Sequence, residues 1–323
     1  MKSNIFTLLC AIALIAYACG GSRSVAENEE SRGDDTSPLE KSQAFENEEN
    51  YEFDEEETEE PSENPENWDT ENTFVVNSAD EFIEAIGSDR VILLKKAIDF
   101  SDISSRGSGK NYRFDPHHDG QELVIIGAKN LKIEGFGDKP VEIITEPRYG
   151  NVLVFENCRN ITIENLNAGH GPEKGYCTGG VFKITNSRGI TINNSIMYGS
   201  GIEGITAENV SRLQCSNSTI RGCTYSIMTL NDCKNFTFYQ CKFTENEEFD
   251  LVNITNSNNV VFDNCNFSNN RTGESQALFN VNEVAGVALK DCTVRNNVAG
   301  SLSNNANAIE WQDTKIHKNK FRN

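Results

Sequence analysis

One short pattern recurs seven times after residue 120, and it constrains the fold more than any other feature of the sequence. Each copy centres on a bend residue, with apolar residues seven and five positions before it and one and three positions after it. Alternation with a period of two on both sides of a bend predicts two short β-strands. The bend residues, spaced by 30, 29, 23, 23, 24 and 27 positions, are Asn130, Asn160, Gly189, Arg212, Asn235, Asn259 and Gly286.

Six of the seven bend residues are Asn or Gly, the two residues that best tolerate a positive φ. Only Arg212 departs from this rule. Two strands per unit, a bend of fixed length and a connection of variable length describe one coil of a right-handed parallel β-helix. A single coil cannot bury its inner face, so the coils must stack, about 4.8 Å apart.

In this pattern and spacing, residues 73–323 resemble the parallel β-helix repeats of the pectin-lyase-like superfamily. The resemblance implies one all-β domain, a right-handed single-stranded parallel β-helix. It does not select an activity, because that superfamily includes lyases, hydrolases, epimerases and non-catalytic adhesins.

The start of this domain carries a helix signal. Ser78 followed by Glu81 forms a capping box, and Phe82, Ile83 and Ile86 give the following turns one apolar face. We expect a short amphipathic helix that closes the open end of the solenoid before a first strand at residues 91–94.

The N-terminus carries an export signal over residues 1–18. Lys2 precedes an apolar run of about 14 residues, which is too short to span a bilayer core but suits a signal peptide. Small residues before Cys19 resemble a bacterial lipobox, which implies a lipid anchor at Cys19 in the cell envelope, on the outer membrane or the cell surface. Ala16-Tyr17-Ala18 also fits an ordinary cleavage site, so a periplasmic or secreted protein stays open.

Acidity is confined to the segment that follows. Residues 22–71 hold 20 Asp or Glu against three Lys or Arg, whereas residues 72–323 hold 29 acids against 25 bases. Residues 19–72 therefore predict a disordered, extended tether. A nearly neutral domain offers no basic face for phosphates, so no nucleic-acid partner is expected. The solenoid is expected to be a monomer.

The cysteines follow the repeat. Small residues stand six positions after successive bends, among them Cys241, Cys265 and Cys292, and Cys158 and Cys233 stand two positions before other bends. Neighbours in such a ladder have parallel Cβ vectors, which is poor geometry for a disulfide. We expect free structural thiols.

Function should lie on the face with the variable connections. The longest early connection, residues 168–177, contains His170, Lys174 and Tyr176, and aligning the coils on Cys177 places other polar side chains beside it. Aromatic and arginine side chains over a flat groove suit sugar rings and carboxylates. The groove expected from this alignment also includes His117, His118, Asp119, Arg148, Tyr149, Tyr198 and Glu203.

One motif points to catalysis. Residues 112–117, Tyr-Arg-Phe-Asp-Pro-His, resemble the Y-x-x-D-P-H element of bacterial mannuronan C5-epimerases, which share the β-helix fold. That resemblance implies catalytic roles for Tyr112, Asp115 and His117 in removing the proton α to a uronate carboxylate, with Arg148 neutralising the carboxylate. The alternative is that Asp115-Pro116 forms a turn and the histidines lie on the surface.

Other catalytic signatures are incomplete. Residues 169–171 echo the Gly-His-Gly of polygalacturonases, but the Asp-Asp pair that family also needs occurs only in the tether, and both pectate lyase signatures are missing. Glu247, Glu248 and Asp250 could hold Ca²⁺, although such exposed carboxylates are more often solvated. No other cofactor is indicated.

The sequence therefore predicts an exported, lipid-anchored β-helix protein that engages extracellular polysaccharide. A uronan lyase or C5-epimerase would use Asp115, His117, Arg148, His170 and Tyr176, whereas a binding protein or structural solenoid would need no base with a perturbed pKa. Whether the protein is an enzyme is left open.

Overall fold

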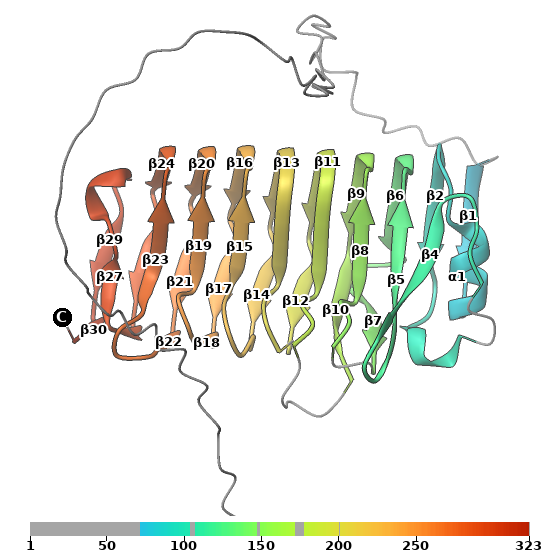
Figure 1. Cartoon of the computed structure of the whole chain (residues 1–323), viewed down its shortest axis with the longest axis horizontal. Coiled ribbons are helices and arrows are strands. Elements are labelled where there is room, and N and C mark those ends of the chain that lie inside the picture. The colour runs from blue at the N-terminus through green and yellow to red at the C-terminus, as the bar shows by residue number, and fades with distance from the viewer. Residues whose placement is uncertain (1–71, 104–106, 147–148, 172–177, 200, 323) are drawn as a thin grey trace, which may run out of the picture. The chain divides into compact units, whose positions relative to one another are not determined.

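The computed structural model describes residues 72–103, 107–146, 149–171, 178–199 and 201–322. These residues form stacked coils of parallel β-strands, the predicted right-handed parallel β-helix (Figure 1). Cys19, Arg148, Lys174, Tyr176 and Cys177 lie outside the described residues. No helix in the described ranges is both long and apolar enough to cross a membrane.

Each full coil contributes three strands, which stack on their counterparts in neighbouring coils. The first strands are β5 (Gly120–Ile126), β8 (Leu153–Glu156), β11 (Phe182–Asn193), β13 (Ile205–Ser216), β15 (Met228–Asn231), β19 (Val252–Thr255), β23 (Ala277–Asn282) and β27 (Ser301–Ser303). The second strands are β2 (Arg90–Leu94), β6 (Lys129–Gly135), β9 (Arg159–Glu164), the later halves of β11 and β13, β16 (Lys234–Tyr239), β20 (Asn258–Asp263), β24 (Ala285–Lys290) and β28 (Ile309–Gln312).

The third strands form a separate sheet, and the last coils add a fourth, short one. The third strands are β3 (Ile98–Asp99), β7 (Val141–Thr145), β10 (Leu166–His170), β12 (Ile196–Tyr198), β14 (Thr219–Arg221), β17 (Lys242–Thr244), β21 (Asn266–Ser268), β25 (Thr293–Arg295) and β29 (Lys315–His317). The short sheet contains β18 (Glu247–Glu248), β22 (Arg271–Thr272), β26 (Val298–Ala299) and β30 (Lys320–Phe321). Two 3₁₀ turns span Phe100–Asp102 and Ala306–Ala308.

The bends behave as predicted. All seven bend residues have a positive φ, from 52° at Asn130 to 72° at Gly189, and Arg212 adopts 57°. The left-handed region costs a residue other than Gly or Asn roughly 1–2 kcal/mol. Among the seven bends, Arg212 alone carries this cost; elsewhere in the coils Gln240, Glu245, Glu283 and Lys318 carry it too.

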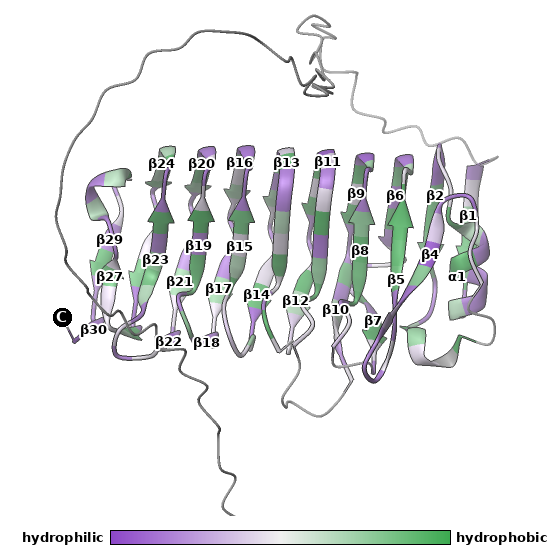
Figure 2. Cartoon of the chain, viewed as in Figure 1, coloured by the Kyte–Doolittle hydropathy of each residue, from purple (hydrophilic) through white to green (hydrophobic). Residues whose placement is uncertain are grey.

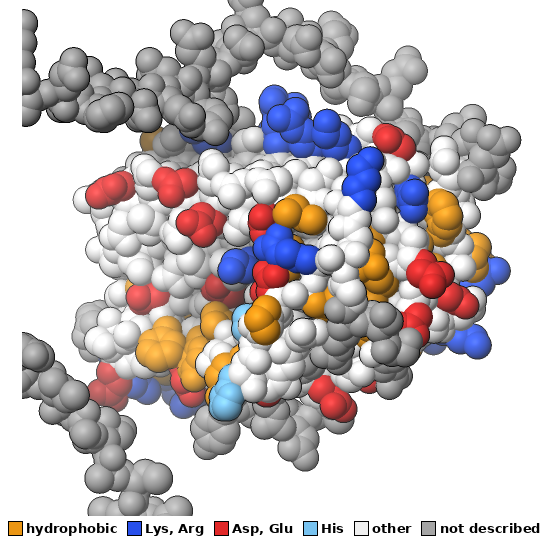
Figure 3. Space-filling model, turned by 45° about the vertical axis from the view of Figure 1, so that its right-hand side comes forward, with side chains coloured by type: hydrophobic (Ala, Val, Ile, Leu, Met, Phe, Trp, Pro, Cys, Tyr) orange, Lys and Arg blue, Asp and Glu red, His pale blue; other side chains and the backbone are white. Residues whose placement is uncertain are grey.

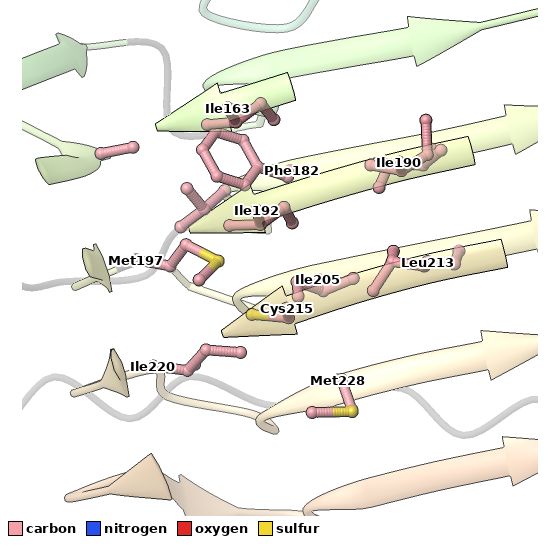
Figure 4. Packing of buried hydrophobic residues seen from close by; sticks show 14 of the residues in the cluster. Ile163, Phe182, Ile190, Ile192, Met197, Ile205, Leu213, Cys215, Ile220 and Met228 are labelled. Atoms are coloured by element: carbon pink, nitrogen blue, oxygen red, sulfur yellow. The ribbon is translucent and has the colours of Figure 1, made fainter. Parts of the chain in front are cut away.

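The interior is a continuous apolar core made of the inward side chains of every coil. Hydrophobic and hydrophilic residues alternate along β11 and β13 (Figure 2). Side chains at equivalent positions stack from coil to coil, as Figure 4 shows for Ile190 and Leu213. Phe238 and Phe262 stack with ring centroids 4.8 Å apart, and Phe243 and Phe267 with centroids 4.6 Å apart.

A ladder of buried asparagines joins the last coils. The amide oxygens of Asn270, Asn297 and Asn319 each accept a hydrogen bond from the backbone N–H of the previous ladder residue, at 2.9–3.0 Å. The amide nitrogen of Asn270 donates to the Phe243 carbonyl at 2.9 Å, and that of Asn297 donates to the Phe267 carbonyl at 2.9 Å. Each of these two side chains thus satisfies two backbone groups of the preceding coil. We call Asn246, Asn270, Asn297 and Asn319 the asparagine ladder.

The described cysteines are free and buried, as predicted. Burial raises the pKa of the Cys158 thiol to about 11 and that of Cys233 to about 12. Both thiols therefore stay protonated at neutral pH, which makes them poor nucleophiles. They fill the core as small apolar groups.

The N-terminal end differs from the prediction in two ways. Strand β1 (Thr73–Val76) precedes the cap helix α1 (Ala79–Ala85), so the helix is inserted between two paired strands instead of preceding the first. Its capping box is present: Ser78 Oγ accepts from Glu81 N–H, and Glu81 accepts from Asn77 N–H. Strand β4 (Tyr112–His117) runs antiparallel to β5 and forms a hairpin, where a parallel coil was expected.

The charge distribution also differs from the prediction. Although the domain is nearly neutral, exposed basic residues line the turns that precede the second strands, and Figure 3 shows Lys and Arg side chains along the upper edge. The expectation that the fold offers no basic face is therefore wrong. Net charge does not report how charges are arranged when a repeat places equivalent positions in line.

Candidate functional site

The variable turns from the third strand of one coil to the first strand of the next form one edge of the solenoid, which we call the rim. Equivalent rim positions in five successive coils are Gly150, Gly179, Ile202, Tyr225 and Phe249. Backbone hydrogen bonds of 3.2–3.3 Å join the last four of these positions in order. A Cβ atom on Gly179 would lie 1.8 Å from the Gly150 carbonyl oxygen, so these two coils approach closely only because Gly179 has no side chain.

The N-terminal part of the rim gathers the histidines. The turn of the β4–β5 hairpin carries His118 and Asp119, and Tyr149 lies over it: Tyr149 N–H donates to Asp119 Oδ1 at 3.3 Å. The His118 and Tyr149 rings have centroids 5.4 Å apart. Figure 3 shows histidine side chains beside hydrophobic and acidic ones on this face. Tyr149 thus stacks over the hairpin turn, as the coil alignment predicted.

A carboxylate and an imidazole meet beside Gly150. His117 Nε2 lies 3.1 Å from Glu122 Oε1, although the two are not aligned as a hydrogen bond. Glu122 is buried, and its Oε2 accepts from the Asn151 backbone N–H at 2.7 Å and from the Asn151 side chain at 2.8 Å. A fixed carboxylate beside a half-buried imidazole has the geometry of a candidate general base and the group that orients it.

His170 has a different environment. It is 3% exposed at the end of β10, and its Nε2 lies 2.9 Å from the Gly150 carbonyl oxygen. A carbonyl only accepts, so Nε2 carries the hydrogen, and the buried Nδ1 has no hydrogen-bond partner among the described residues. Burial lowers the pKa of His170. A neutral imidazole held by the backbone supports the turn at Gly150.

The motif residues do not converge. Side chains alternate along β4, so Arg113, Asp115 and His117 share its outer face while Tyr112 packs against the core on the other face. Asp115 lies 2.7 Å from Arg113, which also reaches Glu156 at 2.6 Å. These carboxylates raise the pKa of the Arg113 guanidinium. The structure thus separates Tyr112 from Asp115 and His117.

Tyr198 is not part of the His117–His118 group. It lies on the sheet of third strands, where it pairs with Gly169, the neighbour of His170. Its ring covers Gly169, where a Cβ atom would lie 2.7 Å from Tyr198 Cζ. The hydroxyl donates to Glu142 at 2.9 Å, and the Arg221 guanidinium lies 5.2 Å from the ring centroid. Burial and the Glu142 contact raise the pKa of Tyr198 to about 12. The side chain is therefore a neutral donor.

Glu203 is also outside the histidine group. It is buried at the start of β13, where its carboxylate accepts hydrogen bonds from Thr206, Ser226 and Thr229 at 2.5–2.8 Å. Burial raises its pKa, and the three hydroxyl donors only partly offset this. These contacts assign Glu203 to the structural support of the coils.

This assignment makes a pH-dependent prediction. The folded protein binds the Glu203 proton more tightly than the unfolded chain does. The contribution of protonated Glu203 to folding stability is therefore complete below the ordinary carboxyl pKa of 4.5. It is lost as the pH rises through the folded-state pKa. Glu203→Gln should raise the midpoint of thermal unfolding at pH 8 while changing it little at pH 4. The matched control is Glu208→Gln, an exposed position on the same strand. An equal shift at both pH values would contradict the assignment.

Sequence analysis missed a hollow at the C-terminal part of the rim. It holds about 510 Å³ and is lined by residues 247–249 and 271–276. Phe249 is 52% exposed, and its ring centroid lies 5.1 Å from that of Tyr225 in the preceding coil. Arg271, which pairs with Glu247 in the strand register, adds a cation to the lining. Tyr225 and Phe249 occupy equivalent turn positions, which the repeat alignment could have revealed.

The expected calcium ligands do not gather in this hollow. Asp250 turns to the next coil, where its carboxylate accepts from the Ala277 N–H at 2.6 Å and from Asn280 at 3.2 Å. Of the three expected ligands, Glu247 and Glu248 line the hollow and Asp250 does not. Within the described ranges, no three His, Cys, Asp or Glu residues are placed to hold a metal ion.

Comparison with known proteins adds to this geometry. Residues 150–321 match the family model described as the right handed beta helix region. The chain belongs to this family. No curated protein sequence matches this β-helix protein.

Solved structures share its architecture. A pectate lyase from Paenibacillus sp. 0602 is 10% identical, with 77% of this chain and 78% of that chain covered and a TM-score of 0.55. An alginate lyase from Paenibacillus sp. str. FPU-7 is 11% identical, with 78% and 98% covered and a TM-score of 0.45. A polygalacturonase from Erwinia carotovora ssp. carotovora is 11% identical, with 77% and 84% covered and a TM-score of 0.41. The likeness to the pectate lyase, at 10% identity, establishes the fold alone.

Proposed function

We propose that this β-helix protein binds extracellular polysaccharide along its rim. The observation that carries the proposal is the line of rim positions from a glycine floor at Gly150 and Gly179 to the aromatic pair Tyr225 and Phe249. Four coil steps of about 4.8 Å separate Gly150 from Phe249, or about 19 Å. That length suits several sugar units of one linear chain better than a single small molecule.

The side chains along the rim suit sugars. Tyr149 and Phe249 are 41% and 52% exposed, and aromatic faces pack against the C–H faces of sugar rings. Arg271 can hold a carboxylate through two parallel N–H donors. Glu247 and Glu248 can accept from sugar hydroxyls. An open hollow with a few polar groups around an aromatic ring is typical of a ligand site.

The proposal includes export and anchoring. The leader and the small residues before Cys19 support removal of residues 1–18 and acylation of Cys19, and the acidic residues 19–72 would separate the solenoid from the membrane. Such a protein would act as a monomer in the bacterial cell envelope. Secretion without a lipid is the alternative, which mass spectrometry of the mature N-terminus would distinguish.

One observation favours catalysis as a second candidate, namely the His117–Glu122 pair. His117 could take the C5 proton of a uronate; a lyase would then break the C4–O bond as the C4=C5 double bond forms and the leaving oxygen takes up a proton, whereas an epimerase would return a proton to the other face. Within the described residues, however, Tyr149 forms no hydrogen bond with His117 or His170. We therefore rank binding first.

Calorimetry of the full chain with polygalacturonate, alginate and a neutral galactan tests the proposal. Phe249→Ala should weaken the bound glycan about tenfold, since an aromatic contact contributes roughly 1.5 kcal/mol. The matched control is Phe136→Ala, because Phe136 is 57% exposed and lies outside the rim. Equal affinity of wild type and Phe249→Ala for every glycan would refute rim binding.

The same samples can be followed by proton NMR to separate the two candidates. Alkene or new anomeric signals that disappear in His117→Ala and Glu122→Gln would establish a lyase or an epimerase. Unchanged glycan spectra with retained binding would leave a binding protein.

A further inference from the structure

A line of cations runs along the edge of the solenoid formed by the bends. Lys129 pairs with Arg159, Arg159 with Arg188, Arg188 with Ser211, and Ser211 with Lys234 in the strand register. Arg212 follows Ser211 directly, so each of five successive coils contributes one basic residue. We call Lys129, Arg159, Arg188, Arg212 and Lys234 the basic column.

The basic column is not used inside the protein. All five side chains are exposed, and none forms an ion pair with another described residue. Among the acids at the ends of the preceding strands, Glu156 is engaged by Arg113 and Asp232 accepts from Asn256. Four steps of about 4.8 Å place five positive charges within about 19 Å, which is a repulsive arrangement.

Arg212 indicates that the basic column is retained although it lowers the stability of the fold. It adopts φ 57° at the one bend where the chain uses neither Asn nor Gly. Partial burial lowers the pKa of Arg212, and the like charge of the nearby Arg188 lowers it further. A residue that is unfavourable both for the backbone and for the charge is expected where a ligand needs it.

We propose that the basic column is a second binding site, separate from the rim, for a linear polysaccharide that carries one carboxylate per repeating unit. Arginine forks bind carboxylates through paired N–H donors. Asn130, Asn160 and Asn235 run beside the column and are exposed. Asn160 donates to Asn130 at 3.0 Å and Asn235 accepts from Asn259 at 2.9 Å, which leaves each amide further hydrogen-bonding capacity for sugar hydroxyls. Nucleic-acid grooves combine cations with aromatic stacking platforms, whereas the solvent-accessible residues next to this column are Asn130, Asn160, Gly189, Ser211 and Asn235, none of them aromatic.

The full chain, titrated with polygalacturonate at several salt concentrations, tests the proposal. We expect Arg159→Gln/Arg188→Gln/Lys234→Gln to raise the Kd about 100-fold, or about fivefold per cation removed, and to flatten its salt dependence. The matched control, Lys242→Gln/Arg295→Gln/Lys315→Gln, removes the same charge from exposed positions on the sheet of third strands. It should change the Kd less than threefold. The acidic segment 22–71 is identical in all variants.

Arg212→Asn is the sharpest single variant. It introduces Asn, the residue found at four of the other bends, so the midpoint temperature of unfolding should rise. The Kd for polygalacturonate should increase about fivefold. Unchanged affinity in the triple variant, an equal loss in its control, or tighter binding of duplex DNA than of polygalacturonate would overturn the proposal. Failure of rim binding would appear separately, in Phe249→Ala with the neutral galactan.

Discussion

Asn270→Ala should lower the free energy of unfolding of the solenoid by about 3 kcal/mol, because unpaired buried polar groups cost roughly 1–3 kcal/mol each. The Asn270 side chain lies in the asparagine ladder and is 1% exposed. Its loss removes the acceptor of the Asn246 N–H and the donor to the Phe243 carbonyl, both in the preceding coil. Two coils would therefore loosen together.

Chemical denaturation gives the change in stability, and hydrogen exchange locates it. The control is Asn258→Ala, since Asn258 is exposed and its backbone N–H alone bonds to the neighbouring coil. Asn270→Asp is a second test: its carboxylate would face the Phe243 carbonyl oxygen, so its stability should recover as the pH falls. A loss no larger than that of Asn258→Ala would show that the ladder contributes little.

Gly179→Ala should disturb both the fold and the rim. The new Cβ atom would lie 1.8 Å from the Gly150 carbonyl oxygen, a backbone atom that cannot turn away. Crowding of this kind costs about 1–3 kcal/mol. The displaced turn contains Gly150, whose carbonyl contacts His170 and which follows Tyr149 in the chain. Because a displaced binding group binds its ligand less well, we expect glycan affinity to fall about tenfold.

Gly171→Ala is the matched control for this variant. Gly171 belongs to the same rim, yet its Cβ atom would have no neighbour closer than 3.6 Å. Thermal unfolding and calorimetry on the two variants separate steric contact from a general intolerance of side chains on the rim. Equal behaviour of the two would mean that the close approach of the coils at Gly179 is not needed.

The repeat made the fold predictable, because a side-chain period of two and a bend with positive φ leave few alternatives. The N-terminal coil was not predictable in the same way. Tyr112–His117 alternates like any other strand, and nothing in that alternation distinguishes antiparallel pairing with β5 from a parallel coil. The same alternation, read in the structure, places Tyr112 on the core side of β4, away from Asp115.

Parts of the candidate site were missed for a related reason. The alignment found Tyr149 over Asp119 because one turn follows the other in register, but it treated Glu247, Glu248 and Asp250 as equivalent carboxylates. In the structure, the Asp250 carboxylate hydrogen-bonds to the next coil, and the Phe249 side chain is exposed. The basic column was hidden by counting charges over the whole domain, although its members occupy equivalent positions.

The common register of the coils has a consequence for how such a chain can change over time. Gain of one coil, about 24 residues between the bends at Asn235 and Asn259, would lengthen the rim and the bend edge by the same single step. Both edges would stay aligned, and a ladder asparagine in the new coil would bond its neighbours as Asn270 and Asn297 do. The number of repeats therefore sets how many units of a polymer the molecule can span, while each individual contact stays the same.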